Sequence, residues 1–269
     1  MATTEEVDAD DPPLRPLRDA GVARAPDDAA DASHHRALIP DGFAPGPSDA
    51  LLVIDVQCDF CAGGALEVPG GDDVVPLCNA LIRAFKRDRV VYSQDWHPPA
   101  HSSFASAHPG RAPFETIDAP YGAQTLWPDH SVRGTRGASF HPKLIVDWGE
   151  ESEESGLGPW VVRKGFRPSV DSYSAFYEND RSTSTGLAEH LKSIGVRRVF
   201  VCGLALDYCV RYTALDARTA GFATVLVCDA TRAVGAGDPG TRAEATETTT
   251  RELEDAGVVV VDGGALGGV

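Results

Sequence analysis

Short apolar runs alternate along the chain with segments that carry apolar residues at helical spacing. Residues 50–54 read Ala-Leu-Leu-Val-Ile and end at Asp55, a pattern typical of a strand that is buried on both faces. Residues 72–86 place apolar side chains at helical spacing, with acidic residues at the start and basic residues at the end, as the helix dipole favours. The sequence therefore predicts a strand followed by a helix.

The same unit recurs to the end of the chain. Further strands are predicted at residues 89–93, 160–163, 199–202, 223–228 and 258–261, and further helices at residues 186–194, 208–220 and 241–256. This alternation predicts an α/β fold, a doubly wound six-stranded parallel sheet with helices on both faces. The irregular segment 94–159 is far longer than a usual connection, so we expect functional residues in it.

The start of the chain differs from the rest. Residues 1–46 are rich in acidic residues, Ala and Pro and show no periodic apolar face, so we expect a disordered acidic tail. Residues 47–269 show no internal repeat and no sharp boundary, so we expect a single domain there. A chain of 269 residues with 42% hydrophobic content is long enough to bury a full core.

Charge and cysteine content exclude several classes of protein. The formal net charge of -16 has the wrong sign for binding a nucleic-acid backbone or an anionic membrane. We see neither a membrane-spanning run nor a signal peptide pattern, so a cytoplasmic protein is expected. Six cysteines are too few for a disulfide framework, which favours a reducing compartment. Cys58 and Cys61 form a C-x-x-C pair, for which an incidental buried role is favoured over a redox or zinc role.

Chemically active side chains directly follow the predicted strands. Asp55 follows the first strand, Asp95 and His97 follow the second, and Lys164 follows the third. The fourth strand is followed by a turn of small residues and then Cys209. Because ligands of open parallel sheets bind beyond the carboxyl ends of the strands, we expect these groups to converge on one edge.

The long segment contains a candidate metal site. Its first part, Gln-Asp-Trp-His-Pro-Pro-Ala-His-Ser-Ser-Phe, places Asp95, His97 and His101 close together, and His130 follows in Trp-Pro-Asp-His. One carboxylate with two or three histidines is a ligand set suited to zinc, iron or manganese. Scattered loop histidines without a metal are the alternative.

Cys209 and Asp55 are candidates for nucleophile and base. Cys209 opens a predicted helix, where amide N–H groups and the helix dipole lower the pKa of a thiol and can bind an oxyanion. Its position alone is equally compatible with a small buried hydrophobe. Asp55 needs a nearby cation or proton because burying a lone carboxylate is costly. Lys164 can supply the cation and Cys209 the proton, which would make Asp55 a general base; a structural salt bridge between Asp55 and Lys164 is the alternative.

Five motifs, in this order, resemble those of the nicotinamidases and pyrazinamidases, within the isochorismatase-like cysteine hydrolases. They are LLVIDVQCDF, QDWHPPAHSSF, WPDHSVRGTRGASF, VRKG and GLALDYCVRYTALDA. The resemblance implies an isochorismatase-like, Rossmann-like three-layer fold for residues 47–269. It also implies hydrolysis of a linear carboxamide, converting nicotinamide and water to nicotinate and ammonia in NAD salvage, with pyrazinamide accepted as well.

The resemblance also implies roles for named residues. The catalytic triad would be Asp55, Lys164 and Cys209, acting through a thioester on Cys209. One divalent metal ion, zinc or else iron or manganese, would be bound by Asp95, His97 and His130, with His101 added in some members. The oxyanion hole would be formed by the peptide nitrogens of Ala205 and Cys209, after a cis peptide between Leu204 and Ala205. Substrate contacts would come from Phe60, Trp127 and Leu204.

Other functions stay open at this point. Cys58 and Tyr208 depart from the family pattern, in which Asn and His are frequent, and this leaves substrate tuning and assembly open. One alternative is a related amidase for another small carboxamide. Another is a hydrolase in which a metal ion activates water and Cys209 is a bystander. A silent binding protein is disfavoured because all three triad positions are filled. The implied partner is a small molecule, with no nucleic acid or membrane, and a homo-oligomer is compatible with the pattern.

Overall fold

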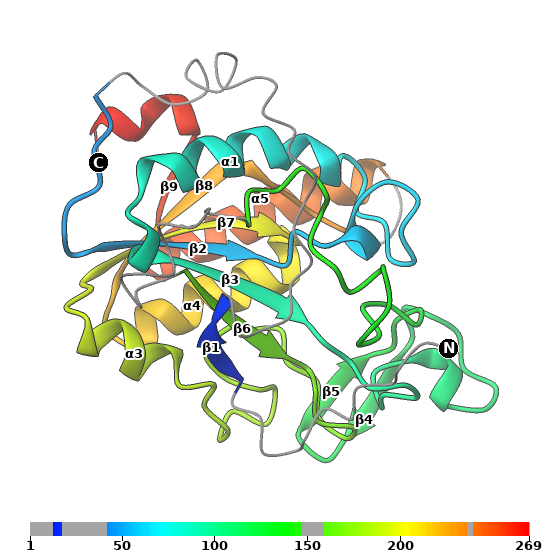
Figure 1. The fold of residues 1–269 in the computed structure, drawn as a ribbon. Coiled ribbons are helices and arrows are strands. Elements are labelled where there is room, and N and C mark those ends of the chain that lie inside the picture. Colours follow the sequence, from blue (N-terminus) through cyan, green and yellow to red (C-terminus); the bar gives the residue numbers. More distant parts are fainter. Residues whose placement is uncertain (1–12, 18–41, 147–158, 236–238, 269) are drawn as a thin grey trace.

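The computed structural model describes residues 13–17, 42–146, 159–235 and 239–268, and its core is one sheet between two layers of helices (Figure 1). The sheet has seven strands in the order β1-β6-β3-β2-β7-β8-β9. In chain order these strands are β1 (Leu14–Pro16), β2 (Asp49–Ile54), β3 (Val90–Asp95), β6 (Trp160–Lys164), β7 (Arg198–Leu204), β8 (Ala223–Arg232) and β9 (Val259–Val261). The six predicted parallel strands are thus confirmed.

Helices cover both faces of the sheet, as the apolar pattern predicts. They are α1 (Val74–Ala84), α3 (Leu187–Ser193), α4 (Arg211–Thr219) and α5 (Pro239–Asp255). Successive side chains of β2 point to opposite faces: Leu51 and Val53 pack in the cluster with α1, whereas Leu52 and Ile54 pack in the cluster with the other three helices. Within the described residues, no helix combines the length and the apolar character that crossing a membrane requires.

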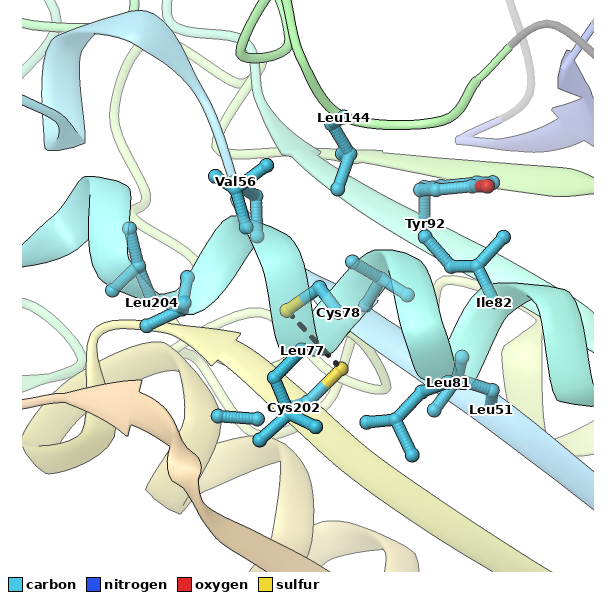
Figure 2. Close-up of a cluster of buried hydrophobic side chains, with 14 of the residues drawn as sticks. Leu51, Val56, Leu77, Cys78, Leu81, Ile82, Tyr92, Leu144, Cys202 and Leu204 are labelled. Atoms are coloured by element: carbon cyan, nitrogen blue, oxygen red, sulfur yellow. Dashed lines mark hydrogen bonds between the residues drawn. The ribbon is translucent and has the colours of Figure 1, made fainter. Parts of the chain in front are cut away.

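The layer beneath α1 is closely packed (Figure 2). Leu77 and Leu81 of α1 lie against the sheet, and Cys78 approaches Cys202 of β7 with 3.7 Å between the two sulfur atoms. Both thiols are fully buried, so these two cysteines pack as small core residues.

The predicted disordered tail is wrong for the part of it that the structure describes. Leu14–Pro16 form β1, which pairs antiparallel with β6 and adds a seventh strand to the sheet. The ring of Phe43 packs 5.7 Å from that of Phe200. A three-residue strand has no periodicity of its own, and it forms because the edge of β6 offers unpaired backbone groups. Residues 1–12 and 18–41 of the predicted tail lie outside the described residues.

The long connection after β3 is mainly irregular, as expected, but contains a hairpin of β4 (Thr116–Ala119) and β5 (Gly122–Thr125). Its residues 147–158 lie outside the described residues. The helix predicted at 208–220 also differs, because a π-helical turn, Leu206–Val210, precedes α4.

The strand order fixes where a ligand can bind. From the central β2, the chain continues to β3 and β6 on one side and to β7, β8 and β9 on the other. Such a reversal in strand order leaves a crevice at the carboxyl ends of the strands. The ends of β2, β3, β6 and β7 all lie along this crevice.

Candidate active site

The predicted triad converges at the carboxyl edge of the sheet. Lys164, the last residue of β6, places its Nζ 2.7 Å from Asp55 Oδ2, 3.3 Å from Cys209 Sγ and 2.5 Å from Asp95 Oδ1. It also donates to Ser172 O at 3.0 Å. A single buried ammonium group therefore contacts the nucleophile candidate and two carboxylates.

Lys164 and Asp95 each stabilise the charged form of the other. Burial alone would lower the pKa of Lys164, but Asp55 and Asp95 raise it well above its ordinary value. Burial alone would raise the pKa of Asp95, but Lys164 and His97 hold it well below its ordinary value. Lys164 therefore stays protonated and Asp95 stays ionised.

The pKa of Asp55 is shifted in the opposite direction from that of Asp95. Asp55 is fully buried, and burial raises its pKa although Lys164 opposes this effect. Ser93 donates to Asp55 Oδ1 at 2.6 Å, and Asp55 N donates to Ser93 Oγ at 3.1 Å. Two neighbouring carboxyl groups whose pKa values are pushed apart are typical of a site that separates the role of base from that of fixed charge.

The predicted lowering of the Cys209 pKa is wrong. Cys209 lies inside the π-helical turn, and burial raises the pKa of its thiol well above the ordinary value. Lys164 offsets this effect only in part, and the charges of Asp55 and Asp95 add to it. The helix-end argument assumes an accessible N-terminal position, which this buried residue lacks. The resting group is a neutral thiol, so a nucleophilic role requires a base.

Asp95, His97 and His130 form a group that fits a metal ion. Asp95 Oδ2 lies 3.6 Å from His97 Nε2 and 3.7 Å from His130 Nε2. Two ligands bound at about 2.1 Å to a tetrahedral metal lie about 3.4 Å apart. His97 Nδ1 faces Gly165 O and His130 Nδ1 faces Pro128 O, each at 2.8 Å. Because a carbonyl only accepts, each Nδ1 carries a proton and each Nε2 offers a lone pair.

Gly165 of the V-R-K-G motif lets His97 approach the site. It has a φ of 64°, and a Cβ built on it would overlap the His97 ring. Burial lowers the pKa of His97, but Asp95 and the Gly165 carbonyl together raise it above its ordinary value.

His101 lies beside this group with both ring nitrogens already bonded. Its Nδ1 lies 2.7 Å from Ser103 Oγ and its Nε2 lies 2.8 Å from Arg167 O. Burial lowers its pKa to about 4, so the ring is neutral. The ring stacks on that of His97 at 4.4 Å. Its donor atoms also lie within 4.8 Å of His97 and Asp171.

A pocket opens beside Cys209. The predicted site residues that line it are Phe60, Asp95, Trp127, His130, Ala205 and Cys209. Five further residues, which the sequence did not point to as site residues, also line the pocket: Leu66, Asp171, Tyr173, Tyr208 and Val234. Asp171 and Tyr173 lie in the loop that follows β6. Because ligands bind beyond the carboxyl ends of the strands, this loop could have been identified from the sequence as a source of site residues besides Lys164.

Leu204 does not line this pocket, which corrects the predicted substrate contact. Its side chain is fully buried in the core cluster beneath α1 (Figure 2). The cis peptide predicted between Leu204 and Ala205 is present.

Cys61 of the C-x-x-C pair belongs to a second group of possible ligands. Cys61, Asp72 and His141 offer donor atoms within 4.8 Å of one another. However, Lys143 N donates to His141 Nδ1 at 3.2 Å, so Nε2 carries the ring proton and donates it to Asp72 Oδ1 at 3.1 Å. Burial raises the pKa of Cys61 to about 12. These bonds describe a hydrogen-bonded pair beside a buried thiol and not a prepared ligand set.

Comparison with known proteins agrees with this geometry. Residues 49–263 match the model of the isochorismatase domain family. The nicotinamidase of Acinetobacter baylyi is 47% identical over 185 residues, covering 69% of this chain and 81% of that protein. A structure from L. infantum in complex with nicotinate has a TM-score of 0.64 at 40% identity, covering 81% of this chain and 95% of that one. The pyrazinamidase of Pyrococcus horikoshii in complex with zinc has a TM-score of 0.61 at 35% identity, covering 80% and 99%. The chain therefore belongs to the isochorismatase domain family and, within it, to the nicotinamidases that its five motifs resemble.

Proposed function

We propose that this protein is a nicotinamidase, a cysteine amidohydrolase that converts nicotinamide and water to nicotinate and ammonia. The observation that carries the proposal is the contact of Lys164 Nζ with both Asp55 and Cys209 beside an aromatic-walled pocket. Phe60 and Trp127 suit a flat ring. The nicotinamidase relative and the nicotinate bound in the L. infantum structure support a pyridine carboxamide as substrate. Pyrazinamide, which has a similar flat ring and the same carboxamide, is expected to be accepted.

The first half of the reaction forms a thioester. Asp55 takes the proton of the Cys209 thiol, and the sulfur forms a bond to the carboxamide carbon while the carbonyl electron pair moves to oxygen. The peptide N–H groups of Ala205 and Cys209 bind this oxyanion. The bond from carbon to nitrogen then breaks, Asp55 gives its proton to the nitrogen, and ammonia leaves.

The second half consumes water. Asp55 takes a proton from water, the water oxygen bonds to the thioester carbon, and the bond from carbon to sulfur breaks. The sulfur regains its proton and nicotinate is released. Lys164 keeps its charge throughout because Asp55 and Asp95 raise its pKa, and it stabilises the thiolate and the ionised base.

Asp95, His97 and His130 would hold one divalent metal ion. The donor set suits zinc, which the Pyrococcus horikoshii structure contains, and iron or manganese are alternatives. A bound ion would supply a Lewis acid that orients the pyridine nitrogen, directly or through water. His101 supports His97 by stacking and is not needed as a ligand in this arrangement.

The cytoplasmic location expected from the sequence is part of the same proposal. All six cysteines are free, which suits a reducing compartment. Assembly into a homo-oligomer stays a prediction.

The test is ammonia release from nicotinamide by the purified protein, with metal content measured on the same sample. We expect activity in the wild type and a loss of about 10⁴-fold or more in Cys209→Ala with the metal retained. Cys228→Ala, outside the pocket, is the matched control and should keep activity. A wild type that does not hydrolyse nicotinamide but hydrolyses another small carboxamide would favour the related amidase. Activity in Cys209→Ala would favour a mechanism in which the metal ion activates water.

A further inference from the structure

Asp59 lies between Phe60, which belongs to the aromatic wall of the pocket, and the loop that carries His130. It belongs to the 3-10 helix Cys58–Phe60 and directly precedes Phe60. Its carboxylate accepts two backbone hydrogen bonds, from Ser131 N to Oδ2 at 2.7 Å and from Ala65 N to Oδ1 at 3.1 Å. Neither the triad nor the proposed metal ligands include this carboxylate.

The bond to Ser131 fixes the neighbour of a proposed metal ligand. Ser131 has a φ of 46°, a left-handed conformation that non-glycine residues adopt only where the surroundings hold them there. Asp59 accepts from Ser131 N, and His97 N donates to Ser131 O at 3.0 Å. His130 and His97 are therefore linked through one residue that Asp59 holds.

The same carboxylate fixes the pocket wall. Beside the bond from Ala65 N, Leu66 N donates to Asp59 O at 3.0 Å. These bonds close the chain around Phe60, and Phe60 and Leu66 both line the pocket. The Phe60 ring meets the His130 ring edge-on at 5.5 Å. The pocket wall and the loop that carries His130 are thus in contact through the Phe60 and His130 rings. Both segments also donate a backbone hydrogen bond to the same Asp59 carboxylate.

Gly137 leaves the space that Asp59 occupies. Asp59 N donates to Gly137 O at 3.0 Å, and a Cβ built on Gly137 would overlap Asp59 Oδ2. Even an alanine methyl group would push the carboxylate away from Ser131. Gly137→Ala is therefore a means of displacing Asp59 without removing its charge.

We infer that Asp59 is a positioning residue that couples the metal site to the aromatic wall, so that His130 and Phe60 keep their places together. The inference rests on the proposed function, because it takes His130 as a metal ligand and Phe60 as a substrate contact. It makes zinc affinity and nicotinamide binding depend on a carboxylate that does not line the pocket.

The test compares zinc affinity and nicotinamide KM in the same full-length variants. Zinc-free protein is titrated with zinc against a chromophoric chelator, and KM is measured at saturating zinc. The variants are Asp59→Ala, Asp59→Asn and Gly137→Ala. The matched controls are Asp229→Ala, which loses a carboxylate that accepts from Gly263 N at 2.8 Å, and Gly264→Ala, where a Cβ meets open space.

Loss of an outer partner of a metal ligand typically weakens metal binding about 10- to 100-fold. We expect this range for Asp59→Ala and Gly137→Ala, and about 3- to 10-fold for Asp59→Asn, which keeps one acceptor oxygen. KM for nicotinamide should rise at least about threefold in these variants even at saturating zinc, because the wall has lost its anchor. Both controls should stay within about twofold of the wild type.

Unchanged zinc affinity in folded Asp59→Asn and Gly137→Ala would overturn the inference. A change in zinc affinity with an unchanged KM would also overturn it, because the wall would then be independent of Asp59. A wild type that binds zinc but releases no ammonia from nicotinamide contradicts the proposed function instead, and the zinc titration still decides whether Asp59 positions His130. A wild type that binds no zinc contradicts both.

Discussion

Lys164 supplies the positive charge that balances two buried carboxylates of the site. Its side chain is fully buried, and it contacts Asp55 and Asp95, which are also buried. Removing one partner from a buried ion pair leaves an uncompensated charge, which typically costs about 3–5 kcal/mol. We therefore expect Lys164 to contribute to stability as well as to the proposed chemistry.

We expect Lys164→Met to abolish nicotinamide turnover and to lower the free energy of unfolding by about 3–5 kcal/mol, measured by urea denaturation. The double variant with Asp55→Asn should lose less than the sum of the two single changes, because the two residues are in contact. Lys192→Met, at an exposed position, is the control for loss of a lysine. Additive losses would show that the ion pair contributes nothing to stability.

A second prediction concerns His101. Both of its ring nitrogens are bonded to protein atoms, so His101→Gln should retain metal close to the wild-type level, whereas His97→Gln should lose it. Metal per subunit, measured by mass spectrometry after gel filtration, distinguishes the two variants. Equal loss of metal in both would make His101 a ligand and would require its bond to Arg167 O to break.

Strand ends allowed the positions of the main site residues to be predicted from the sequence. Asp55, Lys164 and Cys209 come from distant segments, but parallel strands bring their carboxyl ends to one edge. The pKa of Cys209 could not be predicted in this way, because it depends on burial by residues remote in sequence. The substrate contact implied for Leu204 was not met, because its side chain packs in the core cluster beneath α1.

At the scale of elements, the pattern of apolar positions predicted the parallel strands and the four helices. It missed β1 and the hairpin of β4 and β5. The three residues of β1 and the four of each hairpin strand are too short to show a period. Their structure depends on backbone pairing, which amino-acid type encodes only weakly.

The edge strand β1 gives a prediction of its own. Leu17, directly after β1, is 5% exposed, and burial of a leucine typically stabilises by about 1.5–3 kcal/mol. Deletion of residues 1–17 should therefore lower the free energy of unfolding by about 2 kcal/mol and uncover the edge of β6. Turnover per folded molecule should stay within about twofold, because β1 contributes nothing to the pocket.

Deletion of residues 1–12, which precede β1, is the matched control and should leave stability unchanged. Urea denaturation measures the stability and gel filtration measures any association through the uncovered edge. Equal stability of the two truncated proteins would show that β1 pairing contributes little. A large loss of turnover would show that β6 needs β1 to hold Lys164 in place.

At the scale of the whole molecule, the two ends of the parallel strands carry different sets of charged groups. The carboxyl edge concentrates buried carboxylates, a thiol and a lysine, whereas the opposite edge is closed by an ion pair between Asp49 of β2 and Arg198 of β7. Arg198 donates to Asp49 from Nε at 2.9 Å and from Nη2 at 2.8 Å, and Gly46 N donates to Asp49 at 2.7 Å. This pair joins the two central strands far from the pocket.

The Asp49 pair makes the stability of the whole fold depend on pH. Burial alone would raise the pKa of Asp49, but Arg198 and Gly46 N lower it below its ordinary value. A carboxyl group whose pKa is lower in the folded chain contributes stability above its unfolded pKa, near 4, and this contribution is lost as the pH falls through the folded pKa. We therefore expect Asp49→Asn to cost about 1–3 kcal/mol of unfolding free energy at pH 7 and progressively less below about pH 4. Urea denaturation from pH 7 to pH 2.5 measures both curves, and Asp255→Asn, at an exposed position, serves as a control. A difference between wild type and Asp49→Asn that stays constant across this range would mean that Asp49 has the same pKa in the folded and unfolded chains.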